Sequence, residues 1–165
     1  MKRSILTLAP ILAFFHFTAL SCADNDSFVN VKAIETQIYS EIKSHRIESG
    51  ISENDFFVHQ FIMVKEAQLF SAKQAYAAGD SDTTGISLHW DVIHNKIGGY
   101  NDMTLLKSTT STSATDIVAN WTSDSTTNAM LLKDYTQCGV GVEYGADNMA
   151  YITVLMMKAD SPSTQ

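Results

Sequence analysis

The spacing of apolar residues predicts a helix near the start of the folded part of the chain. Apolar residues recur every three or four positions along one face, which is the pattern of an amphipathic helix: Val31, Ile34, Ile38 and Ile42. His45 could extend this face. The polar residues between them are expected to point away from it: Glu35, Glu41 and Lys43. Gly50 then ends the helix, because glycine adopts the left-handed conformation of a helix C-cap without strain.

A second helix is predicted directly afterwards. Ser52, followed three residues later by Asp55, is typical of a helix N-cap. The helix is expected to reach Ala78 on a broad stripe of mainly apolar residues: Phe57, Phe61, Ile62, Val64, Gln68, Leu69 and Ala72. His59 is expected to lie on this helix as a partly buried packing residue. The turn-forming residues 79–82 end it.

The pattern weakens between residues 83 and 106. Leu88 to Ile93 could form either a short helix or an extended segment, and a pair of glycines interrupts it. Met103 to Leu106 is predicted as the first strand. The hydroxyl-rich run from Ser108 to Ser113 has the composition of a solvated loop.

The last third of the chain has the clearest pattern. Ser113 with Asp116 predicts the N-cap of a short helix, whose apolar stripe is Ile117, Val118 and Trp121. A polar loop and a short apolar turn are expected after it.

Two strands joined by a tight turn are predicted next. The first strand has period-two alternation, with Val140, Val142 and Tyr144 on one face and Gly139, Gly141 and Glu143 on the other. The two glycines leave one face bare, which suits the close approach of a neighbouring helix or strand. Turn residues 145–148 precede a second apolar strand over 151–157.

The order of these elements predicts one α+β domain. Helix, helix, irregular middle, strand, helix, strand and strand fit an antiparallel sheet between layers of helices. The 165 residues, 45% of them hydrophobic, suffice for a single core, and no internal repeat is present.

The first residues have the composition of a secretory signal. A basic Lys2-Arg3 pair, an apolar run over 5–20 and small residues at Ser21 and Ala23 predict a signal peptide over 1–23. The alternatives are an uncleaved anchor and a lipoprotein signal that ends at Cys22. We expect a secreted or periplasmic protein with a short lead over 24–30 and no membrane span after cleavage.

The net charge limits the possible partners, and the cysteine count limits the possible disulfides. The net charge of −7 disfavours nucleic acid and anionic membranes, because both attract basic surfaces. After cleavage Cys138 is the single cysteine, so no internal disulfide is expected. Nothing basic adjoins Cys138, and we expect it to be a small buried residue rather than a nucleophile.

The last third resembles the CAP superfamily (cysteine-rich secretory proteins, antigen 5, pathogenesis-related 1), whose unit is also called the SCP domain. Its short bacterial-type members read W-x-x-S-P-G-H-R-x-N-I-L-x-x-x-Y-x-x-I-G-V-G-V and then Y-W-T-Q-V-F. The matching positions are Trp121, Ala129, Leu131, Leu132, Tyr135, the run Gly139 to Val142, Tyr151 and Thr153. His45-Arg46 and Gly50-Ile51 fall where the family has Y-R-x-x-x-G-L. The resemblance implies a three-layer α-β-α sandwich over residues 31–158, followed by a disordered tail over 159–165.

The same resemblance predicts a cavity that has lost its chemistry. Family members usually place two histidines and two acids there. The matching positions hold Thr127 for one histidine, Asn101 for one acid and Asp82, within Ser81-Asp82-Thr83, for the other histidine. Thr and Asn cannot replace imidazole as a strong metal ligand or a neutral-pH base. We therefore expect a divergent member with a degenerate cavity, no metal and no cofactor.

Two functions follow. The first is a non-catalytic extracellular binding module, for which the resemblance suggests a sterol or fatty acid, or a protein partner. The alternative is a hydrolase-like enzyme with a relocated His/Asp cation site. His89 is then the better candidate. His89 and His94 are five residues apart, so on a helix they would lie on different faces and would not form one site.

Overall fold

The computed structural model describes residues 31–52, 57–77, 85–98, 100–110 and 113–159. Five helices surround a four-stranded sheet. The helices are α1 (Val31–Glu48), α2 (Phe61–Tyr76), α3 (Ile86–Ile97), α4 (Ala114–Ser123) and α5 (Ser125–Leu131). The strands are β1 (Val58–His59), β2 (Tyr100–Thr110), β3 (Gln137–Tyr144) and β4 (Ala150–Ala159).

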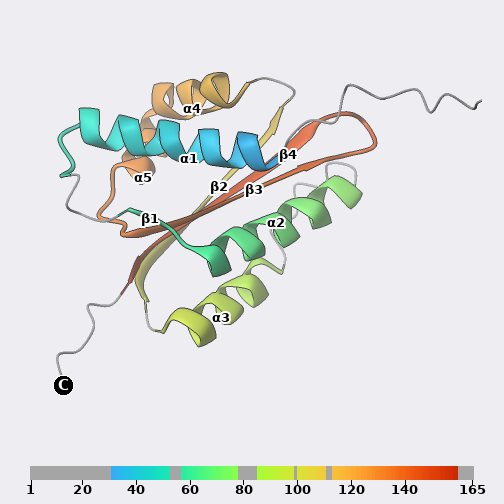
Figure 1. Ribbon diagram of the computed structural model, residues 1–165, viewed down its shortest axis with the longest axis horizontal. Coiled ribbons are helices and arrows are strands. Elements are labelled where there is room, and N and C mark those ends of the chain that lie inside the picture. Colours follow the sequence, from blue (N-terminus) through green and yellow to red (C-terminus); the bar gives the residue numbers. More distant parts are fainter. Residues whose placement is uncertain (1–30, 53–56, 78–84, 99, 111–112, 160–165) are drawn as a thin grey trace, which may run out of the picture.

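The helices form two layers on opposite faces of the sheet (Figure 1). Helices α1, α4 and α5 cover one face, whereas α2 and α3 cover the other. The predicted α+β sandwich is therefore confirmed. Its sheet, in the order β1-β3-β4-β2, is mixed rather than wholly antiparallel, because the two-residue β1 pairs in parallel with β3.

Successive side chains of β3 and β4 point to opposite faces of the sheet, so each face has its own apolar cluster. Val140 and Val142 belong to the larger apolar cluster under α1 and α4, which also contains Trp121 at 7% exposure. A smaller cluster lies under α2 and α3 and contains Met63, Ala67, Ile93, Leu155 and Met157. The predicted burial of Trp121 and pairing of the last two strands are both confirmed, since Val140 lies opposite Val154.

Glycines set how closely α2 approaches the sheet. A Cβ atom at Gly139 would lie 2.2 Å from the backbone carbon of Met63, and one at Gly141 would lie 2.2 Å from that of Ala67. Real Cβ atoms do not come so close to backbone, so a helix at this distance requires glycine on the strand. The prediction that the bare face admits a neighbouring element is confirmed, and the element is α2.

The structure corrects the predicted start and orientation of the second helix. Val58 and His59 form β1, held by hydrogen bonds from Val58 N to Thr136 O (2.9 Å) and from Gln60 N to Cys138 O (2.8 Å). The helix starts only at Phe61, and the Gln60 side chain caps it by accepting from Ile62 N. Its buried face carries Met63, Glu66, Ala67, Phe70, Ser71, Gln74 and Ala75, so the predicted stripe was wrong.

Two segments predicted as loops are regular. Ser108 to Thr110 continue β2, because they pair with residues Ile152 to Ala150 of β4. The segment after α4 is helix α5, whose N-cap Asp124 accepts from Thr127 N. The expected capping of α4 by Ser113 is confirmed. The segment from Leu88 to Ile93, for which a helix and an extended conformation were both open, is helical as part of α3.

Candidate functional site

The predicted cavity positions belong to different elements. Thr127 lies in the first turn of α5, where its backbone N–H (2.7 Å) and its hydroxyl (2.8 Å) both donate to Asp124 Oδ1. These bonds lower the pKa of the Asp124 carboxyl. Asn101 lies where the pairing of β2 with β4 is irregular, between Tyr100 and Asp102. The Asn101 side chain and the whole of Asp82 lie outside the described residues.

His89 is paired with a carboxylate. Its Nδ1 lies 2.7 Å from Glu66 Oε2, and the two side chains are 18% and 11% exposed. The Phe70 ring packs edge-on against the imidazole, with centroids 5.5 Å apart. When Nδ1 donates to the carboxylate, Nε2 is left as the acceptor, which is the arrangement of a general base or a metal ligand. This pair links α2 to α3.

A metal would need further ligands at this pair. Zinc sites in proteins use three or four converging side chains. Among the described residues, no group of three or more His, Cys, Asp or Glu side chains could hold a metal ion. The described part of this site therefore offers an oriented imidazole and one carboxylate.

Glu35 contradicts the expectation that it points away from the core. It is only 3% exposed. Its Oε1 accepts from Val142 N at 3.1 Å, and Gln68 Nε2 donates to both carboxyl oxygens at 2.9 and 2.8 Å. Burial raises the pKa of the Glu35 carboxyl, and these hydrogen bonds oppose the rise. Because β1 pairs only with the first two residues of β3, Glu35 supplies an acceptor that a strand would otherwise provide.

Arg46 has a structural role that the sequence did not reveal. It is 2% exposed and donates to three carbonyl groups, those of Leu131 (2.5 Å), Lys133 (2.8 Å) and Tyr135 (2.9 Å). Its guanidinium carbon lies 4.4 Å from the centroid of the Phe57 ring. Arg46 thus fastens the end of α5 and the following segment to α1.

His59 lies in β1 and not on α2, which corrects its predicted place. Its ring stacks on Tyr39 at 4.6 Å between centroids, and its buried Nε2 has no hydrogen-bond partner among the described residues. Burial lowers the pKa of His59, which favours the neutral imidazole. Cys138, its neighbour on β3, is a free and fully buried thiol whose pKa burial raises. A protonated thiol is a poor nucleophile, so the expected packing role of Cys138 is confirmed.

Three grooves on the described surface differ in size and lining. The groove beside the Trp121 helix, between α1 and α4, measures about 180 Å³ and is largely polar, with Glu41, His45 and Glu48 in its wall. The groove between α1 and α2 measures about 320 Å³; Lys32, Phe61 and Lys65 lie in its lining with the buried Glu35.

The third groove, which we call the α2–hairpin groove, lies between α2 and the β3–β4 hairpin. It measures about 600 Å³ and is lined by Ala72, Ala75, Tyr76, Glu143, Tyr144, Gly145 and Ala146. Small-molecule sites usually measure a few hundred to a thousand Å³ and are mainly apolar. Of the three, the α2–hairpin groove fits that description best.

Sequence reasoning missed Glu35, Glu66 and Arg46 because their partners lie far away in the chain. For Glu35 and its partner Gln68, however, the sequence did contain a signal. Gln68 was a polar residue within the predicted apolar stripe of the second helix, and Glu35 precedes Ile38 by three positions. Buried polar side chains require partners, so polar residues at such positions indicate a pair between elements.

The comparisons with known proteins agree on the fold. No family model matches the chain, and no curated protein matches it in sequence. An outer surface protein from Borrelia burgdorferi superimposes with a TM-score of 0.68 at 17% identity, over 80% of this chain and 97% of that one. An extracellular protein containing an SCP domain from Bacillus anthracis str. Ames gives 0.62 at 14% identity, over 77% of this chain and 41% of that one.

A eukaryotic protein gives the same result. Venom allergen-like protein 4 from Schistosoma mansoni has a TM-score of 0.55 at 14% identity, over 77% of this chain and 89% of that one. Identities this low carry information about the fold and not about activity. The chain has the fold of CAP/SCP-domain proteins, as the residues of its last third indicated.

Proposed function

We propose that the protein is a secreted, non-catalytic binding module that takes an apolar small molecule, a sterol or a fatty acid, into the α2–hairpin groove. The observation that carries this proposal is the groove itself. Alanines and glycine leave about 600 Å³ of space, and Tyr76 and Tyr144 add aromatic surface with a polar tip. Glu143 is the one charged residue in its lining.

The other grooves are less suited to an apolar ligand. The α1–α4 groove is small and has three acidic or basic residues in its wall, Glu41, His45 and Glu48. The α1–α2 groove also has three, Lys32, Glu35 and Lys65, whereas the α2–hairpin groove has only Glu143. An apolar ligand there would remove polar groups from water without pairing them, which costs free energy.

A secreted location is supported by two observations. The first 23 residues have the composition of a signal peptide. Proteins of the same fold are described as extracellular or as outer surface proteins. Among the described residues, no helix has both the length and the apolar character that crossing a membrane requires.

The absence of catalysis is supported by the chemistry at Thr127. Its hydroxyl and its backbone N–H are both committed to the Asp124 carboxylate of the helix cap. A hydroxyl whose proton is donated to a carboxylate inside a cap, with no imidazole at that position, is not placed to act as a base at neutral pH.

Filling the α2–hairpin groove tests this function. Ala72→Trp should abolish binding of a fluorescent fatty acid and of a fluorescent sterol, measured in parallel titrations. Ala129→Trp adds the same bulk to an exposed alanine on α5 and should leave both affinities unchanged. If both variants bind the two probes as tightly as the unmodified protein, the α2–hairpin groove is not the binding site. If the unmodified protein binds neither probe, the proposed ligand class is wrong.

A hydrolase remains the second candidate, because the Glu66–His89 pair orients an imidazole. A screen with ester, amide and phosphodiester substrates separates the two functions. Turnover that disappears in His89→Ala and persists in His94→Ala, an exposed histidine on the same helix, would establish the enzyme. We expect no turnover in any of the three proteins.

A further inference from the structure

Exposed apolar side chains gather on one of the two helical layers. Seven large apolar residues are exposed among the described part of the chain, and five of them lie on α2 and α3. These five are Phe61 (65%), Leu69 (57%), Tyr76 (94%), Leu88 (67%) and Val92 (40%). Single exposed apolar residues are common on proteins, but a concentration on one layer points to an interaction surface.

The five residues follow the helical repeat. On α2, Phe61, Leu69 and Tyr76 are eight and seven residues apart, close to two turns each, so they share one face of the helix. On α3, Leu88 and Val92 are four residues apart. We call these two rows the outer stripes of α2 and α3.

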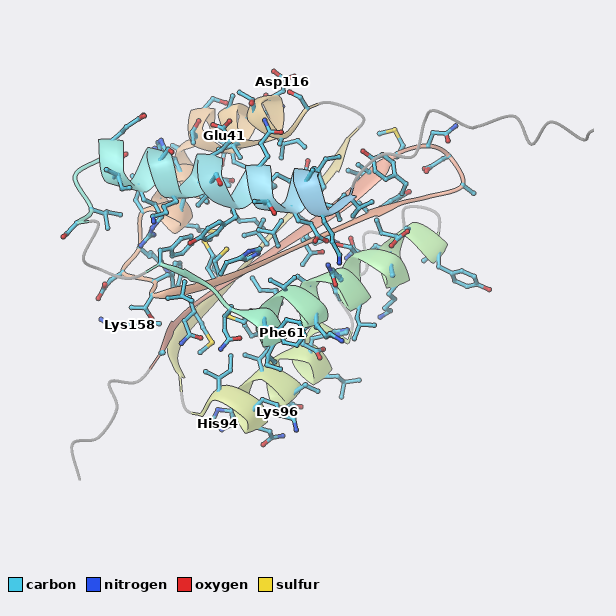
Figure 2. All side chains as sticks on the ribbon, in the orientation of Figure 1. Glu41, Phe61, His94, Lys96, Asp116 and Lys158 are labelled. Atoms are coloured by element: carbon cyan, nitrogen blue, oxygen red, sulfur yellow. The ribbon has the colours of Figure 1, made fainter. Side chains whose placement is uncertain are left out.

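A lysine belongs to each outer stripe. Lys65 lies one turn after Phe61, with its Nζ 5.3 Å from the centroid of the Phe61 ring. Lys96 lies one turn after Val92 and is exposed. Figure 2 shows Lys96 and His94 extending from α3 away from the sheet.

The acids of this layer do not cancel the lysines on its surface. Glu66 is 8% exposed and faces His89, which leaves Asp91 as the exposed acid on α2 and α3. The α1–α4 layer differs, because Glu48 and Asp116 are exposed on it. The two layers therefore present different surfaces within a chain whose net charge is −7.

We propose that the outer stripes of α2 and α3 dock on the surface of an anionic lipid bilayer. Helices that lie in a membrane interface combine an apolar face of aromatic and aliphatic side chains with lysines on the adjoining polar surface, near the headgroups. The lysines are attracted to anionic headgroups, and the apolar side chains enter the boundary between headgroups and acyl chains. This docking is peripheral, and it does not rest on the proposed function.

Charge also argues against a second copy of the chain as the occupant. A symmetric dimer through this face would place the same patch against itself, so that lysine-bearing surfaces of the two copies would face each other. Like charges at such an interface oppose association. An anionic bilayer instead complements both lysines.

The net charge sets the expected character of the binding. The acids elsewhere on the protein repel an anionic surface, but salt at physiological concentration screens charges beyond about 8 Å. Binding should therefore require anionic lipid and weaken at high salt. The sequence-based expectation that anionic membranes are disfavoured rested on the total charge and not on its distribution.

Vesicle co-sedimentation of the secreted protein tests the proposal. We expect binding to vesicles of equal parts phosphatidylglycerol and phosphatidylcholine, and little binding to phosphatidylcholine alone. The double variant Leu69→Ser with Leu88→Ser should lower the partition coefficient at least tenfold. Ile47→Ser, at an exposed isoleucine near the end of α1, is the matched control and should not change it. Circular dichroism and thermal melts establish that each variant is folded.

A charge series gives an independent result. Lys65→Glu with Lys96→Glu should abolish binding to the anionic vesicles, whereas Lys43→Glu on α1 should leave most of it. Equal binding to neutral vesicles, or equal losses in the stripe and control variants, would overturn the proposal. So would a dimer in sedimentation equilibrium that the Leu69→Ser and Leu88→Ser changes dissociate, since that result makes a second copy the occupant.

Discussion

The two helical layers that cover the sheet are held together by different contacts. The α1–α4–α5 layer is joined by side-chain hydrogen bonds between helices. Thr115 lies 3.3 Å from Gln37 Nε2 and donates to Glu41 Oε1 at 3.0 Å, and His45 Nε2 lies 2.7 Å from Asn128 Oδ1. Glu41 on α1 and Asp116 on α4 are labelled in Figure 2.

The α2–α3 layer combines close backbone packing with few polar bonds: the Ser71 hydroxyl on α2 lies 3.0 Å from Gly141 O and 2.9 Å from Thr153 Oγ1. Helix α2 rests on Gly139 and Gly141, and the apolar cluster beneath it is the smaller of the two. The Glu66–His89 pair ties α3 to α2. The comparison teaches that close backbone packing fixes one layer with few side chains, which leaves apolar residues such as Leu69 available on its outer face.

Removing the buried guanidinium of Arg46 should give the largest effect. Arg46→Ala removes a donor from the buried carbonyl groups of Leu131 and Tyr135, and each buried acceptor left unpaired costs about 1–3 kcal/mol. The carbonyl of Lys133 also loses Arg46 but still accepts from Tyr135 N. We expect a loss of about 3 kcal/mol or more in the free energy of unfolding, measured by chemical denaturation. Lys43→Ala, three residues earlier and half-exposed, should change it by less than about 0.5 kcal/mol. A similar small loss for both variants would show that side-chain bonds do not hold this layer.

Adding a Cβ atom where α2 rests on β3 should have the next largest effect on stability. Gly139→Ala places a Cβ against the backbone of Met63, and we expect it to destabilise the protein by about 2 kcal/mol or more. Shortening the neighbouring side chain should not help, because the clash is with backbone. The double variant Gly139→Ala with Met63→Ala should therefore be no more stable than Gly139→Ala. Recovery of stability in the double variant would show that the Met63 side chain sets the distance.

The same contrast between the layers explains which parts of the fold could be predicted from the sequence. The strands of the last third were predictable because alternation and paired glycines have one physical reading. The orientation of α2 was not, because Phe61 and Leu69 are apolar yet exposed, while Glu66 is acidic yet buried. Periodicity assumes that apolar residues face the core, and a layer with an apolar outer face breaks that assumption.

The candidate site was harder to predict than the fold. The Glu66–His89 pair joins two helices, and Glu35 meets Val142 from across 107 positions of sequence. The run after Trp121 resembled a loop in composition, but Asp124 makes it a helix by capping α5. These contacts depend on the packing of distant elements, which local patterns do not specify.

Lowering the pH should change the stability of the folded protein by a smaller amount. Burial lowers the pKa of His59, so the folded protein resists a proton that the unfolded chain accepts near the ordinary value of about 6.5. The stability held by neutral His59 is complete above that value and is lost as the pH falls. The raised pKa of Glu35 acts in the opposite direction, since its contribution is present at low pH and lost as the pH rises.

Comparing His59→Phe with the unmodified protein isolates the histidine. The variant keeps an aromatic ring against Tyr39 and cannot titrate. Its unfolding free energy should fall less between about pH 7.5 and about pH 5 than that of the unmodified protein. The difference cannot exceed about 1.4 kcal/mol per pH unit, the limit for one proton. Parallel curves for the two proteins would show that His59 carries the same pKa folded and unfolded.

Metal should have the smallest effect on either layer. The one imidazole–carboxylate pair between α2 and α3 supplies two ligands among the described residues, and zinc needs three or four. Free metal at ten times its dissociation constant would stabilise the folded protein by about 1.4 kcal/mol. Thermal melts with EDTA, millimolar zinc and millimolar calcium should therefore overlap within error. A rise with one cation that is lost in His89→Ala and kept in His94→Ala would make the α2–α3 contact a metal site. It would also show that a bound cation, besides the close packing of α2 on β3, holds this layer together.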